Sequence, residues 1–310
     1  MSQVESAIAL KSGALVAFPT ETVYGLGADA SNEKSVARIY EVKGRPQEHP
    51  LILHIGSINE INYWAVDINE YAIALARTFW PGPMTLIFKR SGAVKDFVTG
   101  GQDTVGLRVP DHALALELLQ ECKKIGVLAI AAPSANRFGH VSPTTADAVQ
   151  EEIGTYLSAQ DLILDGGPAQ VGLESTIIDC TGNAPKILRP GAITAEMVHE
   201  CTGLNVASEN NSNIRVSGSL EKHYAPAATV RLDIQPGIGE GFIAMAEIPT
   251  PPGSIRLAAP SSLDEYARSL YAALREGDAQ NLKIVCIFPP AGNGLATAIR
   301  DRLTRAEKGR

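Results

Sequence analysis

The sequence has few cysteines, few aromatic residues and no long apolar run. Its four cysteines are widely spaced and form no C-x-x-C pair. This spacing supports neither a zinc site nor a disulfide framework, and it predicts a protein of a reducing compartment. No stretch of about 18 apolar residues occurs, so no membrane-spanning helix is expected.

Positive charge is also scarce. The 310 residues include 27 Lys and Arg against 34 Asp and Glu, which gives a formal net charge of −7. A general nucleic-acid coat protein needs a broad basic face, so this composition argues against that class. The N-terminal residues contain no basic segment followed by an apolar core, so no secretory signal is expected and the expected location is the cytoplasm.

The apolar content is sufficient for a buried core. Apolar residues make up 45% of the chain and aromatic residues only 5%. We therefore expect Val, Ile, Leu and Ala to provide most of the packing. The length predicts one large domain or two ordinary ones.

A polar segment at 208–213 divides the chain, and it is interpreted as a linker because it has no core of its own. Strand and helix patterns alternate on both sides, which predicts an α/β (α+β) protein. We place a first domain at 1–205, a linker at 206–227 and a small α/β domain at 228–310. A domain of about 80 residues is near the lower limit for independent folding, so it is expected to rest on the first. Its strand candidates are Thr229–Leu232, 242–245, 254–257 and 283–288, with helical patterns around 266–274 and 298–303.

The first domain is organised around residues 126–145. Residues 126–132 form a near-continuous apolar run, which predicts a buried strand ended by Pro133. A polar loop follows, and a helical pattern begins at Ala146. Such a loop can bind an anion, because free N–H groups and the helix dipole point into it. The same Ser, Asn and Thr residues can instead serve only as turn residues and a helix N-cap, and this stretch alone leaves both interpretations open.

Residues 104–109 alternate in polarity, which predicts a strand with Gly106 and Arg108 on the same face. Because glycine lets a ligand approach the backbone, this face is expected to line a polar cavity. The alternative is an arginine exposed to solvent.

Polar and basic residues end many separate strand candidates. Several cations at strand ends in an acidic protein predict one electropositive pocket for a polyanion such as a nucleoside triphosphate. No Walker A sequence, G-x-G-x-x-G fingerprint or G-x-S-x-G elbow occurs, and no His and carboxylate spacing indicates a metal site. The residues that share this placement are Thr22, Lys43, Arg45, His54, Arg108, Ser134, Asn136, Ser142, Ser175 and Arg189.

Seven ordered motifs of the first domain resemble those of the YrdC-like threonylcarbamoyl-AMP synthases. A further motif, His-Tyr-Ala-Pro at 223–226, and the second domain resemble the long, two-domain form of that family. The seven motifs are PTETVYGLG at 19–27, KGRP at 43–46, PSAN at 133–136, SPTT at 142–145, DGGP at 165–168, EST at 174–176 and LRPG at 188–191.

The resemblance implies a twisted mixed sheet with flanking helices around a basic cavity, plus a small C-terminal Rossmann-like α/β domain. It implies an activity in which ATP, L-threonine and bicarbonate give threonylcarbamoyl-AMP and pyrophosphate. The product would pass to the machinery that transfers threonylcarbamoyl to tRNA, forming N6-threonylcarbamoyladenosine at position 37. Contact with tRNA itself is expected to be weak or indirect, and no membrane partner is expected.

The resemblance also implies roles for individual residues. The positions expected to hold L-threonine are Thr22, His54, Arg108, Ala132 and Ser175. Those expected to contact ATP are Arg45, His49, Thr104, Ser134, Ser142, Arg189 and Tyr224. The positions expected to serve catalysis near the phosphates are Lys43, Arg45, Ser134 and Asn136. Mg²⁺ is expected as a cofactor carried by ATP, with no metal site in the protein itself.

Two other functions are alternatives to this one. The related single domain has been associated with RNA binding, which the negative net charge disfavours. A related carbamoyl-adenylate enzyme uses carbamoyl phosphate, but such enzymes are larger and carry acylphosphatase and zinc-finger parts. Neither the length nor the scattered cysteines of this chain match those parts.

The linker departs from the family pattern at Ser217, where members often have proline. It ends in Tyr224, within a matched motif. We therefore predict that the linker folds over the pocket as a lid that ATP and threonine order. The alternative is a passive tether, the commoner role of an Asn/Ser-rich linker.

Overall fold

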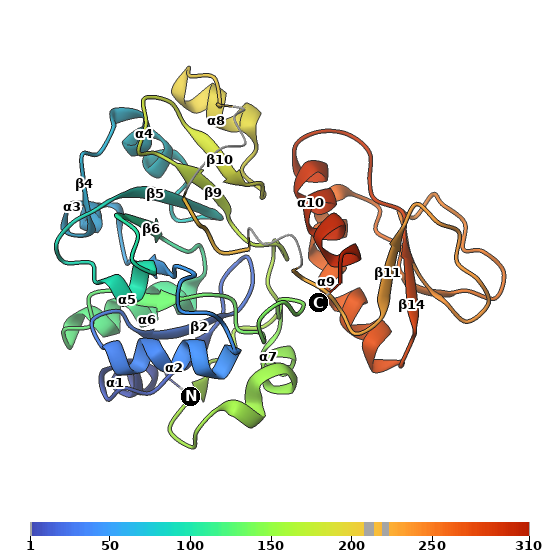
Figure 1. The fold of residues 1–310 in the computed structure, drawn as a ribbon, viewed down its shortest axis with the longest axis horizontal. Coiled ribbons are helices and arrows are strands. Elements are labelled where there is room, and N and C mark those ends of the chain that lie inside the picture. The colour runs from blue at the N-terminus through green and yellow to red at the C-terminus, as the bar shows by residue number, and fades with distance from the viewer. Residues whose placement is uncertain (1, 208–213, 219–222, 310) are drawn as a thin grey trace.

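A computed structural model describes residues 2–207, 214–218 and 223–309. Two α/β domains lie side by side, with the second domain (orange to red) joined to the first by the described ends of the linker (Figure 1). The polar segment 208–213 on which the linker prediction rests lies outside the described residues, as do residues 219–222.

The first domain is built on a mixed sheet of ten strands. The strand order is β10-β9-β5-β6-β3-β7-β2-β1-β8, with β4 paired to β5. The strands are β1 (Val16–Phe18), β2 (Gly25–Asp29), β3 (Ile52–His54), β4 (Ala65–Val66), β5 (Met84–Arg90), β6 (Thr104–Arg108), β7 (Ile130–Ala132), β8 (Leu162–Ile163), β9 (Thr176–Asp179) and β10 (Lys186–Arg189).

Helices cover both faces of this sheet. The side chains of Val16 and Phe18 pack with α1 and α6 on one face, whereas Ala17 packs with α2 and α4 in the main core on the other. This division follows the period-two alternation of strand side chains. The helices are α1 (Gln3–Lys11), α2 (Glu33–Lys43), α3 (Ile61–Trp64), α4 (Glu70–Phe79), α5 (Asp96–Thr99), α6 (Ala113–Lys124), α7 (Ala146–Ile153) and α8 (Ala195–Thr202).

Helix α2 is bounded by capping residues of its own sequence. The Asn32 side chain accepts a hydrogen bond from the backbone N–H of Ser35 and caps the N-terminus. Gly44 adopts a left-handed conformation with φ of 60° and ends the helix. This turn delivers Arg45 to the site described below.

The predicted strand at 126–132 is shorter than expected. Only Ile130–Ala132 forms a strand, because its partners β2 and β3 pair with these three residues alone. The side chain of Leu128 is 41% exposed, so the apolar run does not continue as a buried strand. The Thr145 side chain caps α7 by accepting a hydrogen bond from the N–H of Ala148. This contact is the helix N-cap that was one of the two interpretations of the polar loop after Pro133.

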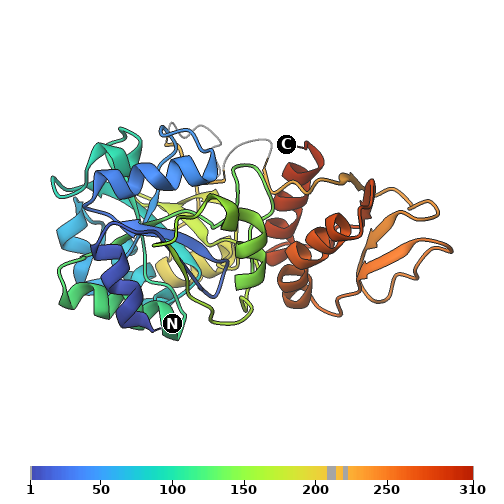
Figure 2. The same ribbon diagram turned by 90° about the horizontal axis from the view of Figure 1, so that it is seen from below.

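The second domain has a four-stranded parallel sheet in the order β11-β14-β12-β13. Its two helices lie between this sheet and the first domain (Figure 2). The mixed α/β class is confirmed for the whole chain. The elements are β11 (Thr229–Leu232), β12 (Gly241–Ile243), β13 (Ile255–Ala258), α9 (Leu263–Ala279), β14 (Ile284–Ile287) and α10 (Leu295–Glu307).

One buried hydrophobic cluster joins the two domains. Val23, Val141 and Leu173 of the first domain, with Tyr224 of the linker, belong to the same buried cluster as α9 and α10. Gly172 lies so close to α9 that an added Cβ would overlap the backbone of Arg268. The second domain therefore rests on the first, as its small size predicts.

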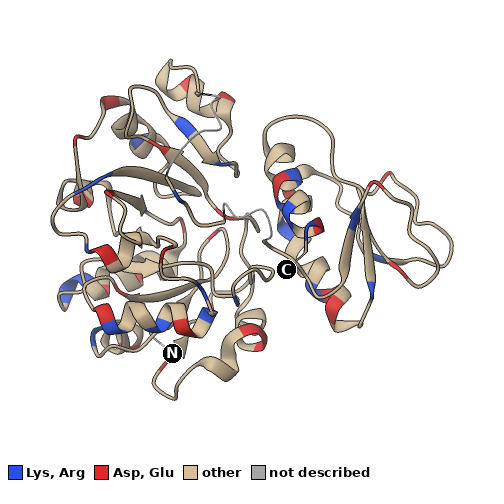
Figure 3. Ribbon diagram, viewed as in Figure 1, with Lys and Arg blue, Asp and Glu red and all other residues tan. Residues whose placement is uncertain are grey.

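Acidic and basic residues are interspersed over both domains (Figure 3). No helix of the described residues is both long and apolar enough to cross a membrane.

Candidate functional site

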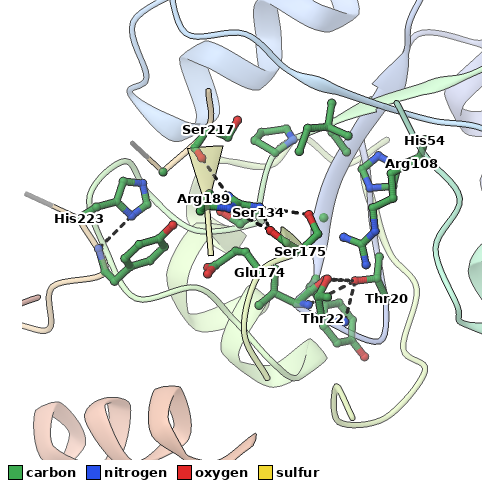
Figure 4. A pocket seen from close by; sticks show the side chains of 18 of the residues that line it. Thr20, Thr22, His54, Arg108, Ser134, Glu174, Ser175, Arg189, Ser217 and His223 are labelled. Carbon is green, nitrogen blue, oxygen red and sulfur yellow. Dashed lines mark hydrogen bonds between the residues drawn. The ribbon is translucent and has the colours of Figure 1, made fainter. Parts of the chain in front are cut away.

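A pocket forms where the ends of the central strands meet the linker (Figure 4). Its empty volume is about 520 Å³, which includes space open to solvent. The sequence-predicted residues that line it are Thr22, Arg45, His54, Arg108, Ala132, Ser134, Ser175, Arg189 and Tyr224. They come from segments far apart in the chain, which the sheet topology brings together.

Arg189, at the end of β10, is buried and bound to neutral oxygens. Its Nε and Nη2 donate to the carbonyl of Ser175 at 3.1 and 2.8 Å, and Nη1 donates to the carbonyl of Ser217 at 2.9 Å. Burial lowers the pKa of this guanidinium. No carboxylate among the described residues forms an ion pair with Arg189. Its charge is therefore available to an anion.

Arg45 follows the left-handed turn at Gly44 and has a similar environment. Its Nη2 donates to the carbonyl of Pro50 at 2.9 Å and to the hydroxyl of Ser217 at 3.1 Å. Burial lowers the pKa of the guanidinium to about 10, and the nearby Arg189 adds to the decrease. The two guanidiniums thus form one electropositive wall of the pocket.

Arg108 points into the pocket from the last residue of β6, as the alternation of that strand predicts. Its Nη2 lies 2.7 Å from the Oε1 of Glu21, and both side chains are almost completely buried. The neighbouring His54 is fully buried, and burial followed by the charge of Arg108 lowers its pKa to about 3. His54 is therefore a neutral imidazole at physiological pH.

Hydroxyl groups surround the arginines. The Thr20 and Thr22 hydroxyls are 2.8 Å apart, and the Ser175 hydroxyl lies 2.8 Å from that of Thr85. Ser134 lines the pocket beside them. These groups can both donate and accept, so they suit a ligand with ammonium, hydroxyl and phosphate groups.

Lys43 and Asn136 do not line the pocket. The Lys43 ammonium is buried and donates to the carbonyls of Ser134 and Asn136 at 2.7 and 2.5 Å. The Asn136 amide donates to the carbonyls of Arg137 and His140 at 2.7 and 2.9 Å. Both residues thus fix the loop that carries Ser134. Their predicted roles in catalysis stay predictions.

Three residues assigned to ATP also lie outside the pocket lining. His49 is half-buried, with its ring centroid 5.4 Å from that of Phe138. Thr104 lines two other hollows, one of which is bordered by residues 215–217. The Ser142 hydroxyl donates to the Oε1 of Glu174 at 2.6 Å. The structure therefore does not bring these three to the pocket, and their contact with ATP stays a prediction.

The linker supplies one wall of the pocket. Ser217 and Gly218 line it together with His223 and Tyr224. Tyr224 adopts a φ of 61°, which is unusual for a bulky residue. The Nδ1 of His223 accepts from the N–H of Tyr224 at 2.9 Å, and burial lowers the histidine pKa to about 3. The described parts of the linker therefore cover the pocket, whereas ordering by substrates stays a prediction.

Other pocket residues received no role from the sequence. Glu174 and Thr20 lie within matched motifs. The Thr20 hydroxyl donates to the carbonyl of Val23 in its own segment at 2.6 Å, whereas Glu174 contacts a distant segment. The Glu174 carboxylate meets Arg302 of α10, which is 128 residues away in the chain. The presence of an acidic residue in a motif was the only signal for this contact.

Several buried polar atoms of the site have no hydrogen-bond partner among the described residues. They are Arg45 Nε, His54 Nδ1, Arg108 Nε and Nη2, both carboxylate oxygens of Glu21 and the Tyr224 hydroxyl. The Arg108–Glu21 contact is close but poorly aligned for a hydrogen bond, so it counts as an ion pair only. Buried polar groups without partners are costly, which points to a polar ligand at this place.

No group of three His, Cys, Asp or Glu side chains in the described parts of the chain is arranged to hold a metal ion. The pocket's two nearby carboxylates, Glu21 and Glu174, are each paired with an arginine.

Comparisons with known proteins match both domains. A family model described as "Telomere recombination", for the Sua5, YciO and YrdC proteins, matches residues 8–191. A second model, described as "Threonylcarbamoyl-AMP synthase, C-terminal domain", matches residues 193–307. Together they cover nearly the whole chain.

Individual relatives match this chain over nearly its full length. The threonylcarbamoyl-AMP synthase of Bacillus subtilis is 38% identical over 330 aligned residues, covering 99% of this chain and 93% of the relative. That of Pyrococcus abyssi is 37% identical, covering 96% and 91%. The crystal structure of Pyrococcus abyssi Sua5 complexed with L-threonine matches with a TM-score of 0.88 at 35% identity, covering 99% of this chain and 94% of that one. The chain therefore belongs to the two-domain threonylcarbamoyl-AMP synthase family.

Proposed function

We propose that the protein joins ATP, L-threonine and bicarbonate to give threonylcarbamoyl-AMP and pyrophosphate. The observation that carries this proposal is the convergence of Arg45, Arg108 and Arg189 on one pocket in a chain of this family. Two of these arginines have only neutral partners, so they can neutralise a triphosphate. The third, at the other end of the pocket, can bind a carboxylate.

The amino acid is assigned to the end of the pocket near Arg108. A guanidinium there binds the threonine carboxylate through a two-pronged contact, which a lysine cannot reproduce. Thr22, Ser175, neutral His54 and the backbone at Ala132 surround the same space. The related Pyrococcus abyssi protein has been crystallised with L-threonine, which supports an amino-acid site in this fold.

ATP is assigned to the wall formed by Arg45, Arg189 and Ser134, with Tyr224 closing the pocket. Lys43 and Asn136 are assigned to holding the loop around Ser134 in place. His49, Thr104 and Ser142 would reach the nucleotide only at the margin of this pocket or after it opens.

The chemistry requires orientation rather than a protein nucleophile. The threonine amine attacks the carbon of CO₂ and loses a proton, or it attacks bicarbonate and a C–O bond breaks with loss of water; either route gives the carbamate. A carbamate oxygen then attacks the α-phosphorus of ATP, while the bond to the β-phosphate oxygen breaks and pyrophosphate leaves. The pocket brings the two reactants together and stabilises negative charge on the phosphates.

Mg²⁺ is proposed to enter bound to ATP. The protein's own carboxylates near the site are paired with arginines, which fits a metal held by phosphate oxygens. When bound, the ion neutralises phosphate charge and polarises the reacting phosphate.

The linker is proposed to act as a lid. Ser217 contacts both Arg45 and Arg189, so closure of this segment is coupled to the residues assigned to phosphate. A closed lid would keep water away from the carbamate and the mixed anhydride. If the linker is only a tether, Tyr224→Ala should leave activity and product stability unchanged.

We propose that the protein works in the cytoplasm and hands its labile product to the enzymes that modify tRNA. Its four cysteines are free thiols, which fits a reducing compartment. Weak or indirect contact with tRNA accords with the net negative charge.

The test is incubation with ATP, threonine and labelled bicarbonate, followed by analysis of the nucleotide product. The label is expected in an adenylate, with one pyrophosphate released for each adenylate formed. Pyrophosphate release at an equal rate without threonine would contradict the proposal. Arg189→Ala and Arg45→Ala should weaken use of ATP, since each removes a charge-assisted contact of about 1.5–3 kcal/mol.

A further inference from the structure

A buried arginine of the second domain reaches the wall of the pocket. Arg302 of α10 is 1% exposed, and its Nε donates to the Oε2 of Glu174 at 2.8 Å. Its Nη2 donates to the carbonyl of Pro190 at 3.0 Å, and its Nη1 to Asp301 at 2.5 Å. One guanidinium therefore holds the residue before Ser175 and the residue after Arg189.

Glu174 is the centre of this contact between domains. Its carboxylate also accepts from the Tyr271 hydroxyl of α9, at 2.9 and 3.2 Å, and from the Ser142 hydroxyl at 2.6 Å. It lines the pocket beside Ser175 and Arg189 (Figure 4). A buried carboxylate in a triphosphate pocket would repel the ligand unless a cation compensates it.

We propose that Arg302 is a positioning residue of the site: as the counter-ion of Glu174, it keeps the pocket electropositive for ATP beside Ser175 and Arg189. This inference rests on the proposed function and deepens it, since it gives the second domain a direct part in nucleotide binding. The sequence motifs did not indicate such a role for α10.

The charges around Glu174 determine how the pair responds to pH. The groups that face it are Arg302 and Asp301 from α10, Tyr271 from α9, His223 and Tyr224 from the linker, and Arg189 from β10. Burial alone would raise the Glu174 pKa, but Arg302 and then Arg189 lower it to about 2. Without Arg302 the pKa should rise, so the carboxylate would become neutral at a higher pH than in the wild type.

The experiment measures the Kd for a non-hydrolysable ATP analogue, by calorimetry, in the full-length protein. Arg302→Gln is expected to raise this Kd about tenfold at about pH 7.5 and by less at about pH 5.5, as Glu174 gains a proton. Adding Glu174→Gln removes the uncompensated charge. The double variant should regain wild-type affinity to within about twofold at both pH values.

Controls separate this effect from loss of structure. Arg300→Gln removes a guanidinium from the same helix whose bonds go to the loop carbonyls of Pro290 and Gly292, and it should leave the Kd unchanged. If Arg302→Gln fails to fold, the Kd of the single variant Glu174→Gln tests the inference instead. Charge compensation predicts equal or tighter binding of the analogue in that variant, whereas a purely structural contact predicts weaker binding.

Three results would overturn the inference. They are an unchanged Kd in folded Arg302→Gln, an equally weakened and pH-independent Kd in the double variant, or weaker binding in Glu174→Gln alone. A wild-type protein that binds no ATP analogue would instead contradict the proposed function itself.

Discussion

Arg108 is the residue whose chemistry is most specific in this site. It is buried, paired with Glu21 and retains N–H groups without hydrogen-bond partners. Arg108→Lys keeps the charge but loses the planar fork, so we expect the KM for threonine to rise about tenfold while the KM for ATP changes little. Steady-state kinetics with each substrate varied in turn will measure this.

Arg45→Lys is the matched variant for Arg108→Lys, because it makes the same change at the wall assigned to ATP. It should shift the KM for ATP instead. If both variants affect the two substrates equally, the division of the pocket into a threonine end and an ATP wall is wrong.

Gly218 is a position where no side chain fits. Its φ is +77°, and an added Cβ would collide with the Tyr224 hydroxyl and approach Arg189. Gly218→Ala should therefore displace Tyr224 and weaken ATP binding about tenfold or more, with little loss of global stability. Binding and thermal unfolding are measured together. Gly182→Ala is the control, since nothing lies within 4 Å of the Cβ position there.

For single residues, the sequence indicated which side chains stand at the ends of strands but not which side chains they contact. Arg108 was placed correctly because alternation along one strand determines a face. Lys43 was assigned to the phosphates by resemblance, yet its ammonium is occupied by two carbonyls of the loop at 134–136. Contacts such as that between Glu174 and Arg302 join distant segments and leave no local pattern.

Among the elements, the segment 214–218 is held at Arg215 by the side chain of Gln102 of the first domain. The Gln102 amide accepts from the N–H of Arg215 at 2.7 Å and donates to its carbonyl at 3.0 Å. Gln102→Ala should loosen the segment and Ser217, so we expect a KM for ATP raised about three- to tenfold, with a smaller change for threonine.

More free adenylate should also hydrolyse during turnover of Gln102→Ala, which product analysis over time will detect. Gln150→Ala, at an exposed position of α7, should behave as wild type. Equal kinetics in the two variants would show that Gln102 takes no part in closing the pocket.

Helices with local start and stop signals were predictable, as α2 and α8 show. Asn32 and Thr194 cap them, and Gly44 and Gly203 end them in left-handed conformations. The strand predicted at 126–132 was too long because strand length depends on the partners. β2 and β3 offer pairing only to Ile130–Ala132, and no feature of the apolar run itself reveals that limit.

For the molecule as a whole, buried ionisable groups predict sensitivity to acid. Burial lowers the pKa of His54 and of His223 from 6.5 to about 3. Between these values the unfolded chain binds protons that the folded chain cannot, so the free energy of unfolding should fall as the pH drops below 6.5. Glu174 and Glu152, with pKa lowered from 4.5 to about 2, should add a further loss below pH 4.5.

Denaturant titrations across this pH range will measure the slope of stability against pH. The double variant His54→Asn/His223→Asn should be less sensitive between pH 6.5 and 4.5, while the loss below pH 4.5 should remain. A wild-type stability that stays constant down to pH 4.5 would show that the two histidines can be protonated in the folded state.

The second domain is attached to the first through the pocket itself. His223 and Tyr224 form part of its wall, the N–H of Ala225 donates to the carbonyl of Gly139 at 3.0 Å, and β11 begins at Thr229. A mechanical load applied between the domains would therefore act on these contacts and on the Arg302–Glu174 pair before it reached either sheet. The pocket would open under tension while both sheets remained intact, and a bound nucleotide would raise the rupture force. In a single-molecule stretching experiment, the first yielding event would thus report whether the pocket is occupied.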